Sequence, residues 1–167
     1  MIVPVTRLPF INADVIAAQR WPESQEAHAY EASQVAAEQR QELIVARASF
    51  ITETVFSHPS KLSLIGGAQD ADYHVTLHVL LVPADLTVSR VGERVRRGGH
   101  AVPEDKVRER YQRLWTLVVQ ARTLAERTYV YDNSSAVTPL RLIASYERGE
   151  PVGTPDWPAW TPVELLS

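Results

Sequence analysis

The sequence predicts a single α/β domain built on a mostly parallel sheet. Short apolar segments alternate along the chain with amphipathic segments of helical period, and strands joined by helices in one sheet run parallel. The strongest strand signal is YHVTLHVLLV over 73–82. Its near-continuous apolar run with β-branched residues is typical of a strand covered on both faces. A length of 167 residues suits one domain, so residues 1–167 are expected to fold together.

Proline and serine divide the first half of the chain into elements. Pro22 is expected to end a helix that begins near Asp14, and Ser24 is expected to cap a longer amphipathic helix. The strand that follows is expected to bury Phe50 and Ile51. In order, the expected elements are a strand over 8–12, a helix over 14–21, a helix from 24 to about 47, a strand over 49–55 and a helix from 59 to between 66 and 71.

The second half repeats the alternation and ends in a hairpin and a tail. Pro103 opens a helix that has Glu104 and Asp105 in its first turn. Trp157 and Trp160 lie in a proline-rich tail that is expected to pack as extended chain. In order, the expected elements are the strand over 73–82, a helix around Arg90, a helix from 103 to about 127, a strand over 129–131 and a hairpin over 140–153 that turns at 148–150.

Composition excludes several classes of protein. The net charge is −3 and the positive charge is concentrated in 90–113, which argues against a domain-wide nucleic-acid binder. The chain has no cysteine, hence no disulfide or thiolate metal site, and a cytoplasmic location is expected. No segment approaches the roughly 20 apolar residues of a membrane span. No spacing of His, Asp and Glu suggests a zinc site, and no residue is assigned as a metal ligand.

Two basic helical segments joined by glycines resemble a lid. Arg90, Arg94 and Arg97 follow one another at i, i+4 and i+7, so they share a helix face. Gly98-Gly99 follows, and a second basic row begins at Lys106. Planar guanidinium groups suit a transferring phosphoryl group, whose negative charge is spread over several oxygens.

Two simpler interpretations of this segment stay open. It can be a solvated helix face, with Glu93 and Arg97 as an i, i+4 pair. It can also bind RNA through 90–113, although no aromatic residues are interleaved with the charge to stack on bases.

Polar residues follow the predicted strands, where ligands of α/β sheets bind. Asp14 follows the first strand, Glu53 and Thr54 end the second, and Asn133 and Ser134 follow the strand over 129–131. Helix N-capping would also explain Asp14. An unpaired carboxylate in an apolar strand is costly, so a site role is the favoured reading of Glu53.

His58 has two readings. It stands beside Pro59 at the end of the second predicted strand. It can contact a substrate there, or it can make a hydrogen bond at the entry of the following helix.

Four blocks of the chain resemble the zeta-toxin family of P-loop kinases. They are FINAD (10–14), SFITETVFS (49–57), LTVSRVGERVRRGGHAVPEDKVRERYQRL (86–114) and YVYDNS (129–134), and together they span about 8–135. The resemblance implies a three-layer, nucleotide-kinase-like P-loop fold. Its helical lid would cover about 86–115, and a C-terminal hairpin and tail would cover about 136–167.

The resemblance also implies an activity, cofactors and partners. The activity is ATP-dependent phosphorylation of a hydroxyl with Mg²⁺ as a second cofactor, and the acceptor is a small molecule or a nucleotide sugar. An antitoxin-like protein is a further implied partner, whose existence the sequence leaves open. Nucleic acid and membranes are not expected partners.

Site residues follow from the matched positions. Asp14 falls where the family has the carboxylate that takes the proton of the attacking hydroxyl. Glu53 and Thr54 fall on the strand that holds the acceptor and shapes the metal–phosphate side, next to His58. Lid positions that reach the phosphates are matched by Arg90 and by one of Arg94 or Arg97, with His100 where some members have a second lid arginine. Asn133 and Ser134 fall in the loop near the adenine.

The phosphate-binding loop of the family has no counterpart here. That loop, GxxxxGK[ST], follows the first strand and precedes the NAD segment. The two lysines, Lys61 and Lys106, do not follow a glycine, and the first glycine is Gly66. The first strand and the loop are therefore expected to be missing, because of a misassigned start or because the chain is a true fragment that binds ATP poorly. The alternative function is a catalytically inactive, zeta-like binding module.

Overall fold

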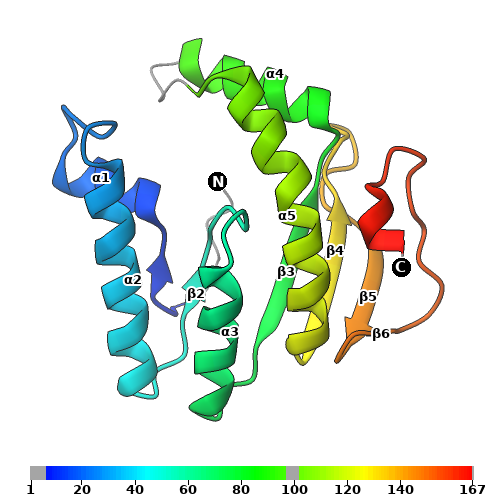
Figure 1. Cartoon of the computed structure of the whole chain (residues 1–167), viewed down its shortest axis with the longest axis horizontal. Helices are drawn as coiled ribbons and strands as arrows, with labels where there is room; N and C mark the ends of the chain where they lie inside the picture. Colours follow the sequence, from blue (N-terminus) through cyan, green and yellow to red (C-terminus); the bar gives the residue numbers. More distant parts are fainter. Residues whose placement is uncertain (1–6, 97–101, 167) are drawn as a thin grey trace. The chain divides into compact units, whose positions relative to one another are not determined.

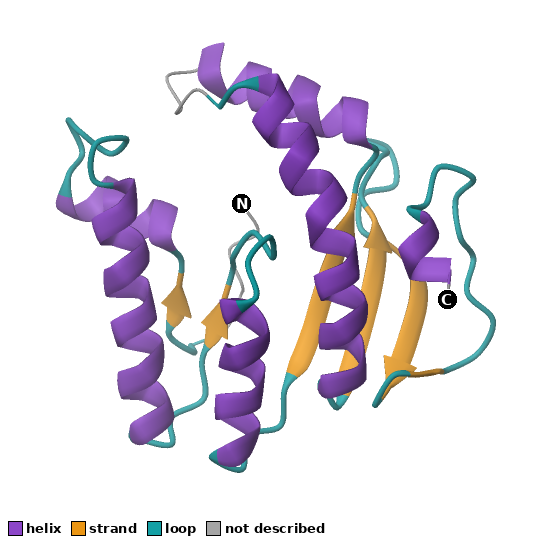
Figure 2. Ribbon diagram, in the orientation of Figure 1, coloured by secondary structure: helices purple, strands orange, loops and turns teal. Residues whose placement is uncertain are grey.

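The computed structural model describes residues 7–96 and 102–166 and contains both helices and sheets (Figures 1 and 2). The predicted α/β class is confirmed. The chain divides into two compact units, Met1–Val55 and Phe56–Ser167. The described strands form a two-stranded sheet, β1-β2, and a four-stranded sheet, β3-β4-β5-β6. Two of their four pairings are antiparallel, so the prediction of a mostly parallel sheet is wrong for the described residues.

The first unit places two helices beside a short parallel strand pair (Figure 1). Its elements are β1 (Phe10–Ile11), α1 (Ala13–Arg20), α2 (Ala29–Val45) and β2 (Ile51–Thr52). The core consists of Ile11, Ile16 and Ala17 with Ala32 and Ala36 of α2. Alanines at i and i+4 let α2 approach its neighbours closely, which explains an alanine-rich helix of low hydrophobicity.

Two boundaries in the first unit differ from the sequence-based prediction. α2 begins at Ala29, and Ser24 is not its cap, because the Ser24 hydroxyl lies 3.1 Å from His28 Nδ1 instead. β2 covers two residues rather than 49–55, because it pairs with β1, which is itself only two residues long. Phe50 and Ile51 are consequently half-buried rather than buried.

The second unit carries the longer sheet. Its elements are α3 (Ser60–Asp70), β3 (Thr76–Leu81), α4 (Ala84–Arg96), α5 (Glu104–Leu124), β4 (Arg127–Asp132), β5 (Arg141–Glu147), β6 (Glu150–Pro151) and the 3₁₀ turn η1 (Val163–Leu166). β3 and β4 pair in parallel over six residues, and β5 and β6 continue the sheet antiparallel. The predicted hairpin is confirmed, with its turn at Arg148 and Gly149. Both residues have positive φ, and a Cβ on Gly149 would lie 3.2 Å from Thr123, so glycine is needed there.

The core of the second unit lies between the sheet and α5 (Figure 1). Val79 and Leu81 of β3 pack with Trp115 of α5, and Trp157 and Trp160 of the tail join them. The tail also forms η1, which the prediction of extended chain missed.

β3 is not covered on both faces as predicted. Its residues alternate between buried or half-buried and exposed, and the exposed ones are Thr76, His78 and Leu80. The histidine inside the apolar run is the signal for this alternation. Within 7–96 and 102–166, no helix is both long and apolar enough to cross a bilayer.

Candidate functional site

In the first unit, the site is organised by Asn12, which directly follows β1. Its side-chain oxygen accepts hydrogen bonds from the backbone N–H groups of Asp14 (2.7 Å) and Val15 (3.1 Å), so Asn12 is the N-cap of α1. Its amide nitrogen donates to Glu53 Oε2 at 3.3 Å. Asn12 is buried, with 8% of its surface exposed, and both ends of its amide are used.

Asp14 and Glu53 are both exposed carboxylates next to this cap. The predicted N-cap role of Asp14 is wrong, because Asn12 takes that position and Asp14 lies in the first turn. Glu53 lies just beyond β2 rather than within a buried strand, so the cost of burying its charge does not arise. Thr54 is exposed as well. The chain thus presents two carboxylates to solvent beside one anchored turn.

The parallel pairing of β1 with β2 is stabilised by side chains that the sequence-based prediction did not include. Thr52 donates its hydroxyl hydrogen to the Ile11 carbonyl at 2.9 Å. Arg40 of α2 donates to the same hydroxyl oxygen at 3.4 Å. Burial lowers the pKa of Arg40. These contacts hold β1 and β2 in register at Ile11 and Thr52, the residues that immediately precede Asn12 and Glu53.

In the second unit, Arg90 of α4 contacts the loop that follows β4. Its guanidinium donates to the carbonyl oxygen of Asn133 at 3.0 Å. The Asn133 N–H in turn donates to the Leu81 carbonyl at 2.9 Å, which fixes the loop to the end of β3. Two of the sequence-predicted residues, Arg90 and Asn133, are therefore brought into contact.

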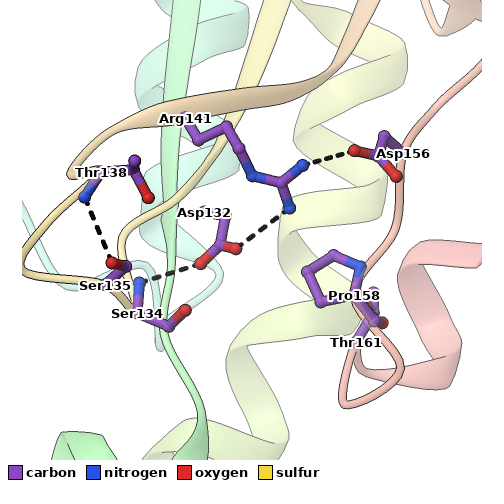
Figure 3. A network of polar contacts seen from close by, with 8 residues as sticks. All are labelled: Asp132, Ser134, Ser135, Thr138, Arg141, Asp156, Pro158 and Thr161. Atoms are coloured by element: carbon purple, nitrogen blue, oxygen red, sulfur yellow. Dashed lines mark hydrogen bonds and ion pairs between the residues drawn. The ribbon is translucent and has the colours of Figure 1, made fainter.

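The same loop is closed by a charged network (Figure 3). Asp132 accepts a hydrogen bond from the Ser134 N–H at 2.9 Å and pairs with Arg141, which also pairs with Asp156. The Ser135 hydroxyl accepts from the Thr138 N–H at 3.2 Å. Burial raises the pKa of Asp132, but the hydrogen bonds from Ser134 and Arg141 outweigh burial and hold the pKa below its usual value.

The remaining predicted residues fall into two groups. Arg94 and His58 are exposed, and the Ser60 N–H donates to His58 Nδ1 at 3.2 Å, as the helix-entry reading expected. Arg97 and His100 lie outside the described residues.

The residues present can be compared with what ATP and magnesium need. Across the described ranges, no group of three or more His, Cys, Asp and Glu side chains could hold a metal alone. Mg²⁺ needs less than this, because it commonly binds one or two carboxylates and takes its other ligands from phosphates and water. The exposed carboxylate of Glu53, held by Asn12, fits that requirement.

Sequence reasoning missed Asn12, Asp132 and Arg141. Asn12 could have been found, since asparagine is as good an N-cap as aspartate and stands two residues before Asp14. Arg141 gave no local signal, because its partners lie 9 and 15 residues away in the sequence.

Comparison with known proteins gives one match. The model of the zeta toxin family matches residues 10–140, most of the chain. No curated protein and no solved structure matches significantly. The matched region contains the cap at Asn12, both exposed carboxylates, the Arg90 contact and the loop after β4. The chain belongs to the zeta toxin family, whose activity is that of a kinase-like phosphotransferase.

Proposed function

We propose that this chain is an ATP-dependent phosphotransferase of the zeta-toxin type that phosphorylates a hydroxyl of a small molecule or nucleotide sugar. The observation that carries the proposal is the pair of exposed carboxylates beside Asn12, inside a region matched by the zeta toxin family. A phosphotransferase of this kind needs one carboxylate to take a proton and a second one on the metal and acceptor side.

Asp14 is proposed as the general base. Its backbone N–H is held by the Asn12 side chain, so its carboxylate is presented from a fixed turn. A carboxylate in that position can accept the hydroxyl proton as the new bond to phosphorus forms. Most of the rate enhancement would come from positioning of the acceptor.

Glu53 is proposed, together with Thr54 and His58, to bind the acceptor and to shape the side of the site that holds the metal and the phosphates. The hydrogen bond from Asn12 orients the Glu53 carboxylate. Mg²⁺, when bound, would neutralise charge on the phosphates. Thr54 and His58 are exposed and carry hydroxyl and imidazole groups that can hydrogen-bond a sugar or phosphate.

The lid residues are proposed to neutralise the transferring group. Arg90 and Arg94 lie on one face of α4, and Arg97 continues that row in the sequence, followed by His100. Asn133 and Ser134 are proposed for the adenine side. The contact between Arg90 and the Asn133 carbonyl supports a link between lid and nucleotide loop. Further proposals are a cytoplasmic location and an antitoxin-like partner.

The glycine-rich phosphate loop decides between activity and binding alone. These 167 residues contain no Gly-Lys-Ser or Gly-Lys-Thr sequence, so the N–H cradle for the β- and γ-phosphates would come from elsewhere. The same observation favours the second candidate, a zeta-like binding module without catalysis.

Two measurements separate the candidates. The coding DNA should be read in frame upstream of Met1, and the longest product should be titrated with ATP and magnesium by calorimetry. The kinase proposal expects a Gly-Lys-Ser/Thr loop in that product and saturable binding. An in-frame stop directly upstream, together with no saturable ATP binding, would contradict it and leave the binding module.

A further inference from the structure

Arg141 joins two segments that are distant in the sequence. It is the first residue of β5, and its guanidinium lies between the carboxylates of Asp132, the last residue of β4, and Asp156, in the C-terminal segment (152–166) (Figure 3). It donates to Asp132 Oδ2 at 3.3 Å and also to Asp156 Oδ2. The hydrogen bond to Asp156 is the larger of the two that raise the pKa of Arg141. One guanidinium therefore connects the end of β4 with the C-terminal segment.

The C-terminal segment holds Asp156 in place. The Asp156 N–H donates to the Ile143 carbonyl at 2.7 Å, and the Val152 N–H donates to the Ser145 carbonyl at 2.8 Å, so the segment runs along β5. Trp157, the next residue, packs against the core of the second unit. The Asp156 carboxylate is therefore presented from a backbone that is bonded to β5 and followed by a packed tryptophan.

At the other end of this link, Asp132 shapes the loop that follows β4. Its carboxylate accepts the Ser134 N–H at 2.9 Å. The Asn133 N–H donates to the Leu81 carbonyl at 2.9 Å, and the Asn133 carbonyl accepts from Arg90 at 3.0 Å. The backbone of the loop is thus held by β3, by the lid helix α4 and by Asp132. The third of these contacts involves a carboxylate that Arg141 binds, so it is connected to the C-terminal segment.

The link reaches beyond the part of the chain that the family model matches. That match covers residues 10–140, which include Asp132 and the loop after it. Arg141 and Asp156 follow the matched region. A position in the matched region, the loop after β4, is therefore held through residues that the family model does not cover.

The pair of Arg141 with Asp156 is better suited to fixing geometry than to stabilising the fold. Arg141 is 43% exposed and Asp156 is 75% exposed, and exposed ion pairs contribute little to the free energy of unfolding. A guanidinium is planar and carries its N–H donors in a fixed fork, so it can bind two carboxylates at once in a defined orientation. Asp156 thereby orients the group that binds Asp132.

We propose that Arg141 and Asp156 are positioning residues for ATP, which hold the backbone of Asn133 and Ser134 in the conformation that receives the adenine. The proposal rests on the function proposed above, in which these two loop residues lie on the adenine side. Asp156 acts through Arg141, and Arg141 acts through Asp132, so the link contributes to nucleotide binding and not to the transfer step. Its loss should raise the KM for ATP and leave kcat unchanged.

The first test measures the loop without ATP, by amide hydrogen exchange of the full chain in NMR. Asp156→Asn keeps the shape of the side chain and removes its charge. Exchange at the Ser134 N–H should accelerate about threefold, within what the loss of one exposed ion pair allows. The matched control is Glu147→Gln, which breaks the exposed pair with Arg127 at the opposite end of β4 and β5 and should leave Ser134 unchanged.

The second test measures ATP use by the longest in-frame product, with magnesium and a nucleotide amino sugar. Asp156→Asn should raise the KM for ATP about threefold, and Arg141→Ala about tenfold because it breaks both contacts. Both should keep the kcat of wild type, and Glu147→Gln should match wild type in KM and kcat. The double variant of Arg141 and Asp156 should have the KM of Arg141→Ala alone, because Asp156 acts through Arg141. Circular dichroism of each variant checks the fold.

Each failure has its own signature. Unchanged exchange at Ser134 in Asp156→Asn would overturn the link, whatever the activity. Accelerated exchange with an unchanged KM for ATP would overturn the role in nucleotide binding, and so would a fall in kcat alone. A further rise in KM on adding Asp156→Asn to Arg141→Ala would show that Asp156 does not act through Arg141. A wild type that neither binds nor uses ATP would overturn the function proposed above and the nucleotide role together, whereas the exchange data would still report the link.

Discussion

Asn12 in the first unit and Asp132 in the second each accept a backbone hydrogen bond with the side chain. They do so with different functional groups, an amide and a carboxylate. Asn12 directly follows β1 and Asp132 is the last residue of β4, and each accepts a backbone N–H from two residues further along, Asp14 in one case and Ser134 in the other. Asn12 is neutral, so its amide can also donate to the carboxylate of Glu53. Asp132 is charged, so it requires a cation, which Arg141 supplies.

The difference shows why the residue type matters at each turn. A carboxylate at position 12 would repel Glu53, whereas an amide at position 132 would lose the pairing with Arg141. The turn at Asn12 therefore leaves the carboxylates of Asp14 and Glu53 exposed to solvent, whereas the carboxylate of Asp132 is held in the turn and in its pair with Arg141. Exchange of the two residue types should separate these roles.

The largest effect on stability is expected from Asp132→Ala. This change removes the acceptor of the Ser134 N–H and the partner of Arg141, and it should cost about 2 kcal/mol in the free energy of unfolding. Asp132→Asn keeps the turn and loses the charge, and should cost about half as much. Urea denaturation followed by circular dichroism measures both. Equal costs for the two variants would show that the charge contributes nothing.

Asn12→Ala is expected to cost about 1 kcal/mol, the typical value of an N-cap. The loss should be local, so amide exchange at Asp14 and Val15 should accelerate, whereas exchange in β4 should not change. Asn12→Asp should retain the slow exchange because aspartate also caps helices, but it loses the amide that donates to Glu53. Unchanged exchange in Asn12→Ala would contradict the assignment of Asn12 as the cap.

The pH dependence of stability should report the charged turn. The pKa of Asp132 is lower in the folded protein than in the unfolded chain, so its contribution is fully present above the unfolded value of about 3.9. That contribution is lost as the pH falls from there through the folded pKa. As the pH falls below about 4, wild type should therefore lose more stability than Asp132→Asn. Parallel curves for the two proteins would remove Asp132 as the cause.

The smallest effect is expected from Arg108→Ala, which breaks exposed pairs with Asp85 and Glu104. Exposed ion pairs contribute little, so the free energy of unfolding should fall by less than in Asn12→Ala, and the difference should shrink in high salt. Denaturation at two salt concentrations checks this. A cost comparable to that of Asp132→Ala would show that surface charge, rather than the turn, dominates the second unit.

Much of the helical framework could be predicted from the sequence. Proline marks the starts of α3 and α5 and the end of α1, because it restricts the backbone around itself in a known way. The start of α2 could not be predicted, since Ser24 contacts His28 instead of capping a helix. The length of β2 could not be predicted either, because it is set by pairing with β1, which is a tertiary contact.

In the candidate site, too, some features could be predicted from the sequence and others could not. The position of Asp14 and Glu53 at strand ends predicts them as site residues, but it does not predict that Glu53 is exposed or that Asn12 anchors both. The contact between Arg90 and Asn133 joins residues 43 positions apart, and no local pattern reports such a pair. The predicted site roles themselves stay predictions.

Phosphoryl transfer by Asp14→Asn tests the central claim most directly. The longest in-frame product, wild type or variant, would be given ATP, magnesium and a nucleotide amino sugar, and labelled phosphate in the sugar product would be counted. Glu31→Gln, which changes an exposed acid in the first turn of α2, serves as the matched control. If Asp14 is the base, its variant should lose about 100-fold or more in turnover with nearly unchanged ATP affinity, and the control should match wild type. Full turnover by Asp14→Asn would contradict the account.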